Sequence, residues 1–327
     1  MAKFKVIVTD ALSESYDIER SVLSAAGAEL TVYGAPGDDG FMDAVCGADG
    51  ILCNLAKLSA THVAAMEKCK VISRYGIGYD NVDVAACTRR GIWVANVPDY
   101  CQKEVSEHTL ALMMSLARRI PQKNSGIRNG AWDSERKDAI VRLWGKTASL
   151  LGFGSIPRSM APALRALGMT VKACDPYVEA ETMEAAGVQK TDLRGLLESA
   201  DFLCVHLPYS EQTRGMIGDK EFAQMKAGAI VVNTSRGGIV DEAALARALS
   251  DGRIAGAGLD VFENEPLPAD SALLRFENCI VTDHCAWYSA ESLAELKAKC
   301  AQNVCDVLQG GRPKYPVNMI VQKGRIK

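Results

Sequence analysis

LLGFGSIP, residues 150–157, is the stretch that decides the fold of this chain. Its leucines end an apolar run that is typical of a buried strand, a glycine pair follows, and residues 158–167 have the composition of a helix. In this context Gly152 makes the tight turn, and Gly154 lets backbone N–H groups approach a pyrophosphate at the helix N-terminus. The stretch therefore predicts a dinucleotide-binding strand–turn–helix, and the alternative is an ordinary glycine turn.

An acidic residue ends the next expected strand. Residues 170–174 are mainly apolar, and Asp175 follows Gly154 by 21 positions. A carboxylate at about this distance accepts hydrogen bonds from the adenosine ribose of a dinucleotide. The same carboxylate would repel a 2′-phosphate, and residues 176–178 contain no arginine to attract one. The sequence therefore favours NAD over NADP.

One residue departs from the usual G-x-G-x-x-G pattern, because Pro157 stands where the third glycine is expected. Proline is tolerated in the first turn of a helix, since its missing N–H would have no partner there. The third glycine normally permits close packing of helix on strand, so we expect Pro157 to push the helix slightly away. We also expect Pro162 to kink this helix.

Short apolar runs alternate with helix-length amphipathic stretches along the whole chain, which is typical of parallel α/β layers. The expected strands are 5–9, 29–32, 50–53, 71–73, 92–94, 148–151, 169–174, 202–205, 229–233, 254–260 and 279–282. The main expected helices are 14–26, 59–68, 82–90, 102–119 and 289–308. Between the two halves, residues 122–145 are polar and carry Trp132 and Trp144. A connection of this length is usually functional or contacts another subunit.

The composition excludes several classes of protein. The chain has 327 residues, of which 48% are hydrophobic and 24% are charged, and this length predicts about two domains. A formal charge of −3 does not fit a polybasic protein that binds nucleic acid or a membrane surface. No run approaches the ~18 apolar residues of a membrane span, and MAKFKVIVTD at the N-terminus resembles a first strand rather than a signal peptide. We expect a cytoplasmic protein without nucleic-acid or membrane partners.

The eleven cysteines do not form a metal-binding pattern. None is part of a Cys-x-x-Cys motif, and most lie in apolar strand or helix patterns, where a free thiol behaves as a small hydrophobic group. We therefore expect reduced cysteines and no zinc or other metal site.

The four histidines limit the choice of an acid/base group. His62 and His108 lie within expected helices, where packing or surface roles are the simpler interpretation. His206 and His284 each follow an expected strand, which is where open α/β sheets bind their ligands. Their positions alone leave both open as candidates.

Two further strand ends supply polar partners. Arg236 lies in NTSRGG, residues 233–238, and its guanidinium is suited to binding a carboxylate with two hydrogen bonds. The stretch GLDVFENEP, residues 258–266, carries several acids. An arginine for a substrate carboxylate, a histidine to transfer a proton and a glutamate to support it would suffice for reduction of a keto acid. Sequence spacing does not show that these groups converge.

The ordered motifs resemble the D-isomer-specific 2-hydroxyacid dehydrogenase family over nearly the whole chain. The matching segments are RYGIGYDNVD at 74–83, the glycine loop, Leu207-Pro208 with Thr213, NTSRG at 233–237, DVF at 260–262, Glu265 and His284. The resemblance implies two doubly wound parallel-sheet domains separated by a cleft. Residues 101–287 would form a Rossmann-type NAD-binding domain, and residues 1–100 with 288–327 a flavodoxin-like substrate domain. The segment around both tryptophans resembles the dimerisation arm of the family, which implies a homodimer.

The resemblance also implies the reaction, which is NAD-dependent interconversion of a 2-oxo acid and a D-2-hydroxy acid. His284 would give a proton to the carbonyl during reduction and take it back during oxidation. Glu265 would hydrogen-bond His284 and support its protonated form. Arg236 would hold the carboxylate and the keto oxygen of the substrate.

The binding residues implied by the resemblance form two sets. The cofactor would contact Thr109, Gly152, Gly154, Ser155, Ile156, Asp175, His206, Leu207, Pro208, Thr213, Thr234, Ser235, Arg236, Asp260 and His284. In this set Asp260 would bind the nicotinamide carboxamide. The substrate would contact Arg74, Ile77, Gly78, Arg236 and Trp287, with the N–H groups of Ile77 and Gly78 cradling its carboxylate.

Details within the family narrow the choice. Formate dehydrogenases carry glutamine in place of Glu265, and phosphite dehydrogenases carry lysine in place of Ile77. AWYS at 286–289, together with Arg74, resembles the C-terminal binding proteins and their bacterial enzyme relatives, in which the tryptophan packs on the substrate. Core packing is the alternative role for Trp287. A 3-phosphoglycerate substrate is less favoured, because the chain ends before the regulatory domain that many such enzymes append.

A function of another class competes with the enzyme. The chain could be an NAD(H)-sensing dimeric interaction protein of the corepressor type, with little or no turnover. Pro157 keeps this alternative open, since a displaced helix would weaken the cofactor site.

Overall fold

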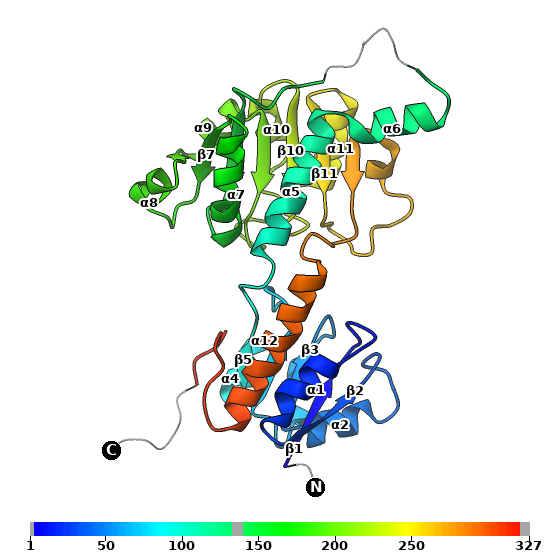
Figure 1. Ribbon diagram of the computed structural model, residues 1–327, viewed down its shortest axis with the longest axis vertical. Helices are drawn as coiled ribbons and strands as arrows, with labels where there is room; N and C mark the ends of the chain where they lie inside the picture. Colours follow the sequence, from blue (N-terminus) through cyan, green and yellow to red (C-terminus); the bar gives the residue numbers. More distant parts are fainter. Residues whose placement is uncertain (1–2, 133–139, 321–327) are drawn as a thin grey trace. The chain divides into compact units, whose positions relative to one another are not determined.

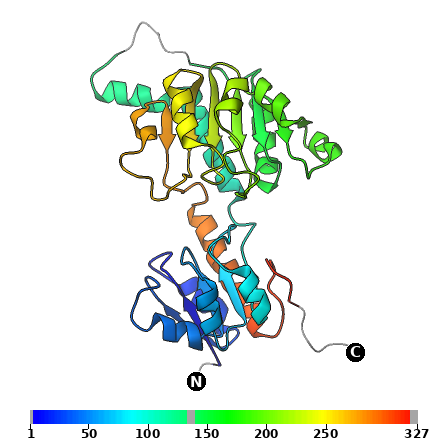
Figure 2. The same cartoon turned by 180° about the vertical axis from the view of Figure 1, so that it is seen from behind.

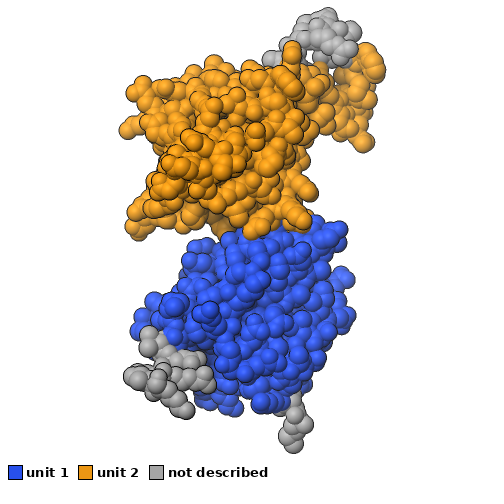
Figure 3. All heavy atoms as spheres, turned by 60° about the vertical axis from the view of Figure 1, so that its left-hand side comes forward, with its two compact units in different colours: residues 1–101, 289–327 blue, residues 102–288 orange. Residues whose placement is uncertain are grey.

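The computed structural model describes residues 3–132 and 140–320, so the middle of the expected dimerisation arm and the end of the C-terminal tail lie outside the described residues. The chain forms two compact units (Figure 3). Unit 1 comprises Met1–Cys101 and Ser289–Lys327, and unit 2 comprises Gln102–Tyr288. Each unit is built around one parallel sheet.

The sheet of unit 1 has the order β2-β1-β3-β4-β5, which is the flavodoxin-like arrangement (Figure 1). Its strands are β1 (Phe4–Val8), β2 (Ala28–Val32), β3 (Gly50–Cys53), β4 (Val71–Arg74) and β5 (Trp93–Ala95). Most residues of strands β1, β3 and β4 are buried, because a central parallel strand is covered on both faces.

Helices cover both faces of this sheet (Figures 1 and 2). They are α1 (Asp17–Ser24), α2 (Phe41–Gly47), α3 (Ala60–Ala65), α4 (Val84–Arg90) and α12 (Ala290–Leu308). Helices α1 and α12 pack together, and α12 also contacts β3 and β4. A Cβ atom on Gly50 of β3 would lie 2.7 Å from Val304, so glycine allows α12 to lie close to the sheet. Ile7, Ile51 and Ile72 pack with α2, α3 and α4 in a separate hydrophobic cluster.

The seven-stranded sheet of unit 2 has the order β12-β11-β10-β9-β6-β7-β8, and all its strands run parallel. The strands are β6 (Thr147–Leu151), β7 (Thr170–Cys174), β8 (Gln189–Lys190), β9 (Phe202–Val205), β10 (Ala229–Asn233), β11 (Ile254–Leu259) and β12 (Cys279–Val281). The strand order reverses between β6 and β9, where Leu151 pairs with Val205. A reversal of this kind opens a crevice at the carboxyl ends of the strands, where such sheets bind ligands.

Two hydrophobic clusters fill the opposite faces of this sheet. Helices α5 (Gln102–Ala117) and α7 (Ser155–Ala166) cover one face. Helices α9 (Leu193–Ser199), α10 (Asp219–Gln224) and α11 (Glu242–Ser250) cover the other. The remaining elements are α6 (Ile120–Arg128), α8 (Ala180–Ala185) and the 3₁₀ turn η1 (Ala272–Arg275). The predicted fold class, two parallel-sheet α/β domains, is therefore confirmed.

Helix α5 lies unusually close to β11. A Cβ atom on Gly258 would be 3.0 Å from Cβ of Leu112, and one on Gly256 would be 3.1 Å from Leu116. The two glycines thus let α5 pack directly onto the strand. This packing fixes the position of α5 relative to the carboxyl ends of the strands.

The polar connection predicted over 122–145 is partly wrong, because helix α6 occupies Ile120–Arg128. Helix α5 ends at Ala117 rather than Arg119, and Arg119 takes a left-handed φ of 52° between the two helices. Pro121 lies in the first turn of α6, where proline favours a helix start rather than an interruption. Among the described residues, no helix is long and apolar enough to cross a membrane.

Helix α7 begins at Ser155 and continues through Pro162 to Ala166. Pro157 is buried in its first turn. Met160, Ala161 and Leu164 are buried in the core of unit 2, so the helix remains packed on its sheet despite both prolines.

Candidate active site

Gly152 makes the turn that leaves β6. Its φ is 96°, in the left-handed region, and a Cβ atom there would lie 2.6 Å from the carbonyl oxygen of His206. Its N–H donates to Cys174 at 2.9 Å, and the N–H of His206 donates to Leu151 at 2.8 Å. The glycine turn is therefore held between the ends of β7 and β9, at the reversal of strand order, and only glycine fits there.

The start of α7 offers backbone N–H groups to a ligand. Gly154 precedes the helix, and a Cβ atom on it would meet nothing within 4 Å. The N–H groups of the first helical turn have no acceptor within the helix, and Pro157 has no N–H to satisfy. Arg158 donates from Nε to the carbonyl of Phe153 at 3.0 Å, which ties the loop to the helix. This open, electropositive end fits the pyrophosphate of a dinucleotide.

Asp175 links the end of β7 to the glycine turn. Its carboxylate accepts the N–H of Phe153 at 2.9 Å on one oxygen and the N–H of Tyr177 at 2.9 Å on the other. Each carboxylate oxygen can accept a further hydrogen bond. The group is therefore held in place and still able to accept bonds from ribose hydroxyls.

His206 differs sharply from His284 in its surroundings. Among the described residues, neither ring nitrogen of His206 has a hydrogen-bond partner, and both nitrogens are buried. Burial lowers the pKa of His206 to about 4, so its ring is neutral at neutral pH. Such a ring is a poor proton donor, whereas its orphaned nitrogens fit a polar ligand atom at the strand reversal.

The loop that follows His206 is closed by Thr213. The Thr213 hydroxyl donates to the carbonyl of Pro208 at 2.8 Å and accepts the N–H of Ser210 at 2.8 Å. The side chain of Leu207 lies against the glycine turn, 3.1 Å from where a Cβ atom on Gly152 would stand.

Asn233 shapes the turn that carries Arg236. Its side-chain oxygen accepts the N–H of Ser235 at 3.0 Å and the Ser235 hydroxyl at 2.8 Å. Its amide nitrogen donates to the carbonyl of Arg236 at 2.9 Å. Asn233 is not among the predicted site residues, although a buried asparagine at the end of an apolar strand is a signal that could have revealed it.

Two loops of the site touch at a glycine. A Cβ atom on Gly237 would lie 1.8 Å from the carbonyl oxygen of Phe262. The N–H of Asp260 also donates to the carbonyl of Asn233 at 3.0 Å. The loop with Arg236 and the loop with Glu265 are therefore joined through their backbones.

Glu265 and His284 form a hydrogen-bonded pair. Nδ1 of His284 lies 2.7 Å from Oε2 of Glu265, and the N–H of Phe262 donates to Oε1 at 3.0 Å. Partial burial acts to raise the pKa of Glu265, but these hydrogen bonds and the charges of His284 and Arg236 outweigh it and lower the pKa. An ionised carboxylate only accepts, so Nδ1 of His284 is the donor and Nε2 is left to exchange a proton.

The backbone at His284 is strained. Its φ of 56° lies in the left-handed region, which costs a non-glycine residue about 1 kcal/mol. The buried carboxylate of Asp260 accepts the N–H groups of Cys285 and Ala286, both at 2.9 Å. Asp260 therefore holds the two peptide groups that follow His284 and fixes the direction of its ring.

Thr109 borders this group of residues from α5, and Trp287 follows His284 by three positions in the chain. Thr109, on α5, lies 2.8 Å from Thr234 between their hydroxyl oxygens, and both residues are buried. The ring of Trp287 meets Tyr288 edge to face with centroids 5.5 Å apart. Within unit 2 the structure thus brings Thr109, Thr234 and Asp260 to the same edge as the Glu265–His284 pair.

Three potential metal ligands also meet at this edge. His108, Asp260 and Cys285 each place one donor atom within 4.8 Å of the others. Hydrogen bonds from Thr282, Cys285 and Ala286 already engage the Asp260 carboxylate, so we interpret the group as a hydrogen-bond network. The expectation that the chain binds no metal stays a prediction.

Of the predicted substrate residues of unit 1, Arg74 ends β4, and Ile77 and Gly78 lie in the turn that follows it. A Cβ atom on Gly76 would lie 1.7 Å from the guanidinium of Arg74, so glycine allows that side chain to cross the turn. The carbonyl of Ile77 accepts from Asn96 at 2.7 Å, and the carbonyl of Gly76 accepts the N–H of Val97 at 2.9 Å. These bonds leave the N–H groups of Ile77 and Gly78 at a partly exposed turn.

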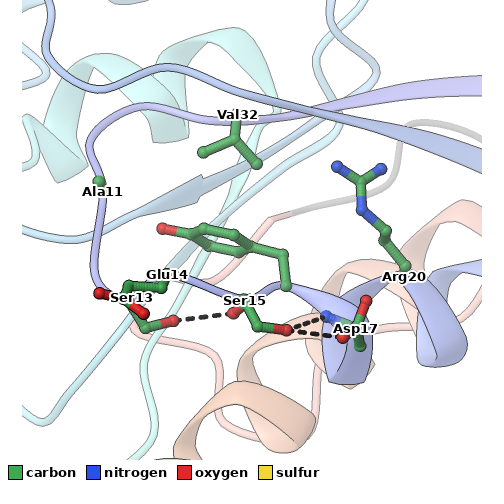
Figure 4. Close-up of a pocket in the computed structure, with 8 residues that line it drawn as sticks. Ala11, Ser13, Glu14, Ser15, Asp17, Arg20 and Val32 are labelled. Atoms are coloured by element: carbon green, nitrogen blue, oxygen red, sulfur yellow. Dashed lines mark hydrogen bonds between the residues drawn. The ribbon is translucent and has the colours of Figure 1, made fainter.

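A buried ionic network holds Tyr75, the residue between Arg74 and Gly76. The Tyr75 hydroxyl donates to Glu19 at 3.0 Å, and Lys297 of α12 lies 3.6 Å from the other Glu19 oxygen. Lys297 also donates to the Ser13 hydroxyl at 2.9 Å. Ser13 lines a surface pocket of about 530 Å³ with Ser15, Asp17, Arg20 and Val32 (Figure 4). None of the predicted site residues lines this pocket.

Comparisons with known proteins agree with this geometry. Residues 110–286 match the family model described as D-isomer specific 2-hydroxyacid dehydrogenase, NAD binding domain. A D-3-phosphoglycerate dehydrogenase of Archaeoglobus fulgidus is 40% identical over 80% of this chain, which spans 50% of that protein's length. A glyoxylate reductase of Korarchaeum cryptofilum is 37% identical, with 80% of each chain covered. The D-lactate dehydrogenase of Aquifex aeolicus, solved with NAD and lactic acid, has a TM-score of 0.85 at 27% identity, covering 93% of this chain and 96% of its own.

Proposed function

Because the chain belongs to the D-isomer specific 2-hydroxyacid dehydrogenase family, we propose that it is an oxidoreductase that interconverts a 2-oxo acid and a D-2-hydroxy acid. Residues 110–286 are the NAD-binding domain of this family, so NAD is the cofactor. When bound, NAD supplies or accepts a hydride at its nicotinamide ring. We propose that unit 1 is the substrate domain, for which the sequence predicts residues 1–100 and 288–327.

The observation that carries this proposal is the pairing of Glu265 with His284. The carboxylate holds Nδ1 of the imidazole at 2.7 Å, so Nε2 gives a proton to the carbonyl oxygen during reduction and takes it back during oxidation. Glu265 stabilises the charge that the ring carries between these steps. The pairing supports turnover, and it favours an enzyme over an NAD(H)-sensing interaction protein.

Charge and backbone donors would bind the substrate. Arg236 would pair its guanidinium with the carboxylate and the keto oxygen, since a planar fork makes two parallel hydrogen bonds. The N–H groups of Ile77 and Gly78 would supply further donors to the carboxylate, with Arg74 beside them. Trp287 would pack on the substrate side chain.

The remaining cofactor residues follow from the strand ends of unit 2. The N–H groups of Ser155 and Ile156 would bind the pyrophosphate, and Asp175 the adenosine ribose. Asp260, Thr109 and the 234–236 turn would border the nicotinamide. The 206–208 segment and Thr213 would line the cofactor on the other side of the strand reversal.

We further propose a homodimer in the cytoplasm. Ile120 and Ile127 on α6, with Trp132 and Trp144 after it, are large exposed apolar side chains, and such groups mark a surface that binds a partner. The eleven free thiols suit a reducing compartment. Size-exclusion chromatography with light scattering, run at several protein concentrations, would measure the molar mass and so test the dimer. A monomer mass at every concentration would contradict it.

A panel of 2-oxo acids tests the activity. The purified protein is mixed with NADH and glyoxylate, hydroxypyruvate, pyruvate, 2-oxoisocaproate or phenylpyruvate, and NADH oxidation is followed by absorbance. We expect turnover with at least one of them. NADH binding without any turnover would instead favour the sensing role.

A further inference from the structure

His108 is the first residue of a hydrogen-bond chain in unit 2 that continues through Thr282 to Asp260. It lies on α5, with its side chain 23% exposed, and its Nε2 is 3.0 Å from the hydroxyl oxygen of Thr282. The Thr282 hydroxyl lies 2.5 Å from Oδ1 of Asp260. Asp260 is the residue that holds the backbone after His284.

The chemistry of the groups sets the direction of this chain. The Asp260 carboxylate accepts, so Thr282 donates its only hydroxyl proton to it. The Thr282 oxygen is then left as an acceptor, and Nε2 of His108 must carry the hydrogen between them. His108 is therefore a donor whose partner is oriented toward Asp260.

Helix α5 reaches both loops of the site from neighbouring positions. Thr109, which follows His108, contacts Thr234 at 2.8 Å in the Arg236 loop. His108 contacts Thr282 in the His284 loop. Because Gly256 and Gly258 let α5 pack directly onto β11, both contacts start from a helix fixed on the sheet.

We propose that His108 is a positioning residue for the proton transfer by His284. It keeps the Thr282 hydroxyl directed at Asp260 and away from its other acceptor, the carbonyl of Leu259 at 3.5 Å. Asp260, held in this way, keeps the N–H groups of Cys285 and Ala286 in place and so maintains the strained backbone of His284. This role rests on the proposed function, in which His284 transfers the proton.

Four variants separate this role from simple packing. His108→Phe keeps a planar ring and removes the donor, while His108→Gln retains an amide N–H that can reach Thr282. Thr282→Val removes the hydroxyl at nearly constant shape. The double variant His108→Phe/Thr282→Val completes a double-mutant cycle, which measures the interaction between the two side chains. His62→Gln is the matched control, since His62 lies on α3 of unit 1 and has no part in the proposed site.

The measurements are single-turnover oxidation of bound NADH by the best 2-oxo acid, its KM, and NADH affinity by fluorescence. For the loss of one hydrogen bond we expect His108→Phe to slow turnover about three- to tenfold. NADH affinity should fall by less than the rate, because Asp260 borders only the nicotinamide, and the proposed pyrophosphate and ribose contacts at Ser155, Ile156 and Asp175 are unchanged. His108→Gln should retain most of the rate, and the double variant should be no slower than Thr282→Val.

Two results would overturn the role of His108, provided that the wild type is active. One is a rate loss in the double variant equal to the sum of the two single losses in free energy, and the other is a His108→Gln variant as slow as His108→Phe. A loss of NADH affinity as large as the loss of rate would also overturn it. Nitrogen NMR of labelled histidines gives a readout independent of activity, with His108 assigned by its absence in His108→Gln. We expect its hydrogen on Nε2, and a hydrogen on Nδ1 alone contradicts the proposal. A wild-type protein that reduces no 2-oxo acid would instead overturn the proposed function itself.

Discussion

Gly237 and Phe262 are in direct backbone contact, because a Cβ atom at position 237 would lie 1.8 Å from the Phe262 carbonyl oxygen. The contact joins the loop of Arg236 to the loop of Glu265. No rotation of a side chain can relieve such a clash, since both partners are main chain. The spacing between the guanidinium and the Glu265–His284 pair thus depends on a residue without a side chain.

Gly237→Ala should therefore separate the two loops and impair catalysis while leaving the distant parts of unit 2 folded. Misplacement of reacting groups by about 1 Å can cost roughly 100-fold in rate, and we expect a loss of kcat/KM of that order. Steady-state kinetics would measure it. Gly47→Ala is the control, since a Cβ atom on Gly47 would meet nothing within 4 Å. An active Gly237→Ala variant would show that the loops can move apart harmlessly.

His284→Ala should abolish turnover and leave NADH binding nearly intact. General acid catalysis contributes about 10²- to 10⁴-fold, and the variant also loses the partner of Glu265. Turnover with the best 2-oxo acid and NADH fluorescence titration check the two parts separately. If the variant kept most of its activity, another group would have to move the proton.

Arg236→Lys should raise the KM for the 2-oxo acid by about 10- to 100-fold. A lysine keeps the charge but presents a single point donor, so it cannot reproduce the two parallel contacts of a guanidinium. The KM is measured at saturating NADH. An unchanged KM would place the carboxylate of the substrate elsewhere.

His206 makes the stability of unit 2 depend on pH. Burial lowers the pKa of His206 from 6.5 to about 4, so the unfolded chain binds its proton more readily than the folded one. Stability is therefore complete above pH 6.5 and is lost as pH falls toward 4, by up to about 3 kcal/mol.

Urea unfolding of the cofactor-free protein at pH 7 and pH 4.5 measures this effect. The wild type should lose about 2 kcal/mol more between the two pH values than His206→Gln, whose side chain does not titrate. Equal losses in the two proteins would mean that the folded state already solvates the ring.

The parallel sheets could be predicted from the sequence because their central strands are buried on both faces. Strands β3, β9 and β10 lie where their apolar runs indicated, and each run ends at a polar residue or a turn. The sequence does not predict helix α6, because a proline at 121 favours the end of a preceding helix as readily as the first turn of a new one.

The site was harder to predict than the sheets. Resemblance to a family pointed to Glu265 and His284, but their contact joins positions 19 residues apart that no periodicity relates. For His108 the sequence favours a packing or surface role, because a histidine within a helix carries no local signal. Its contact with Thr282 spans 174 positions and exists only because α5 crosses β11.

The last long helix of the chain belongs to its first unit. Helix α12 packs on α1 and over β3 and β4, and its Lys297 pairs with Glu19 inside that unit. During synthesis, residues 1–101 leave the ribosome long before this helix exists, whereas unit 2 emerges as one uninterrupted segment. Nascent unit 1 therefore lacks the helix that covers β3 and β4, and its Glu19 lacks the Lys297 partner until that helix is made. Unit 2 is the first to have all of its sequence available for folding.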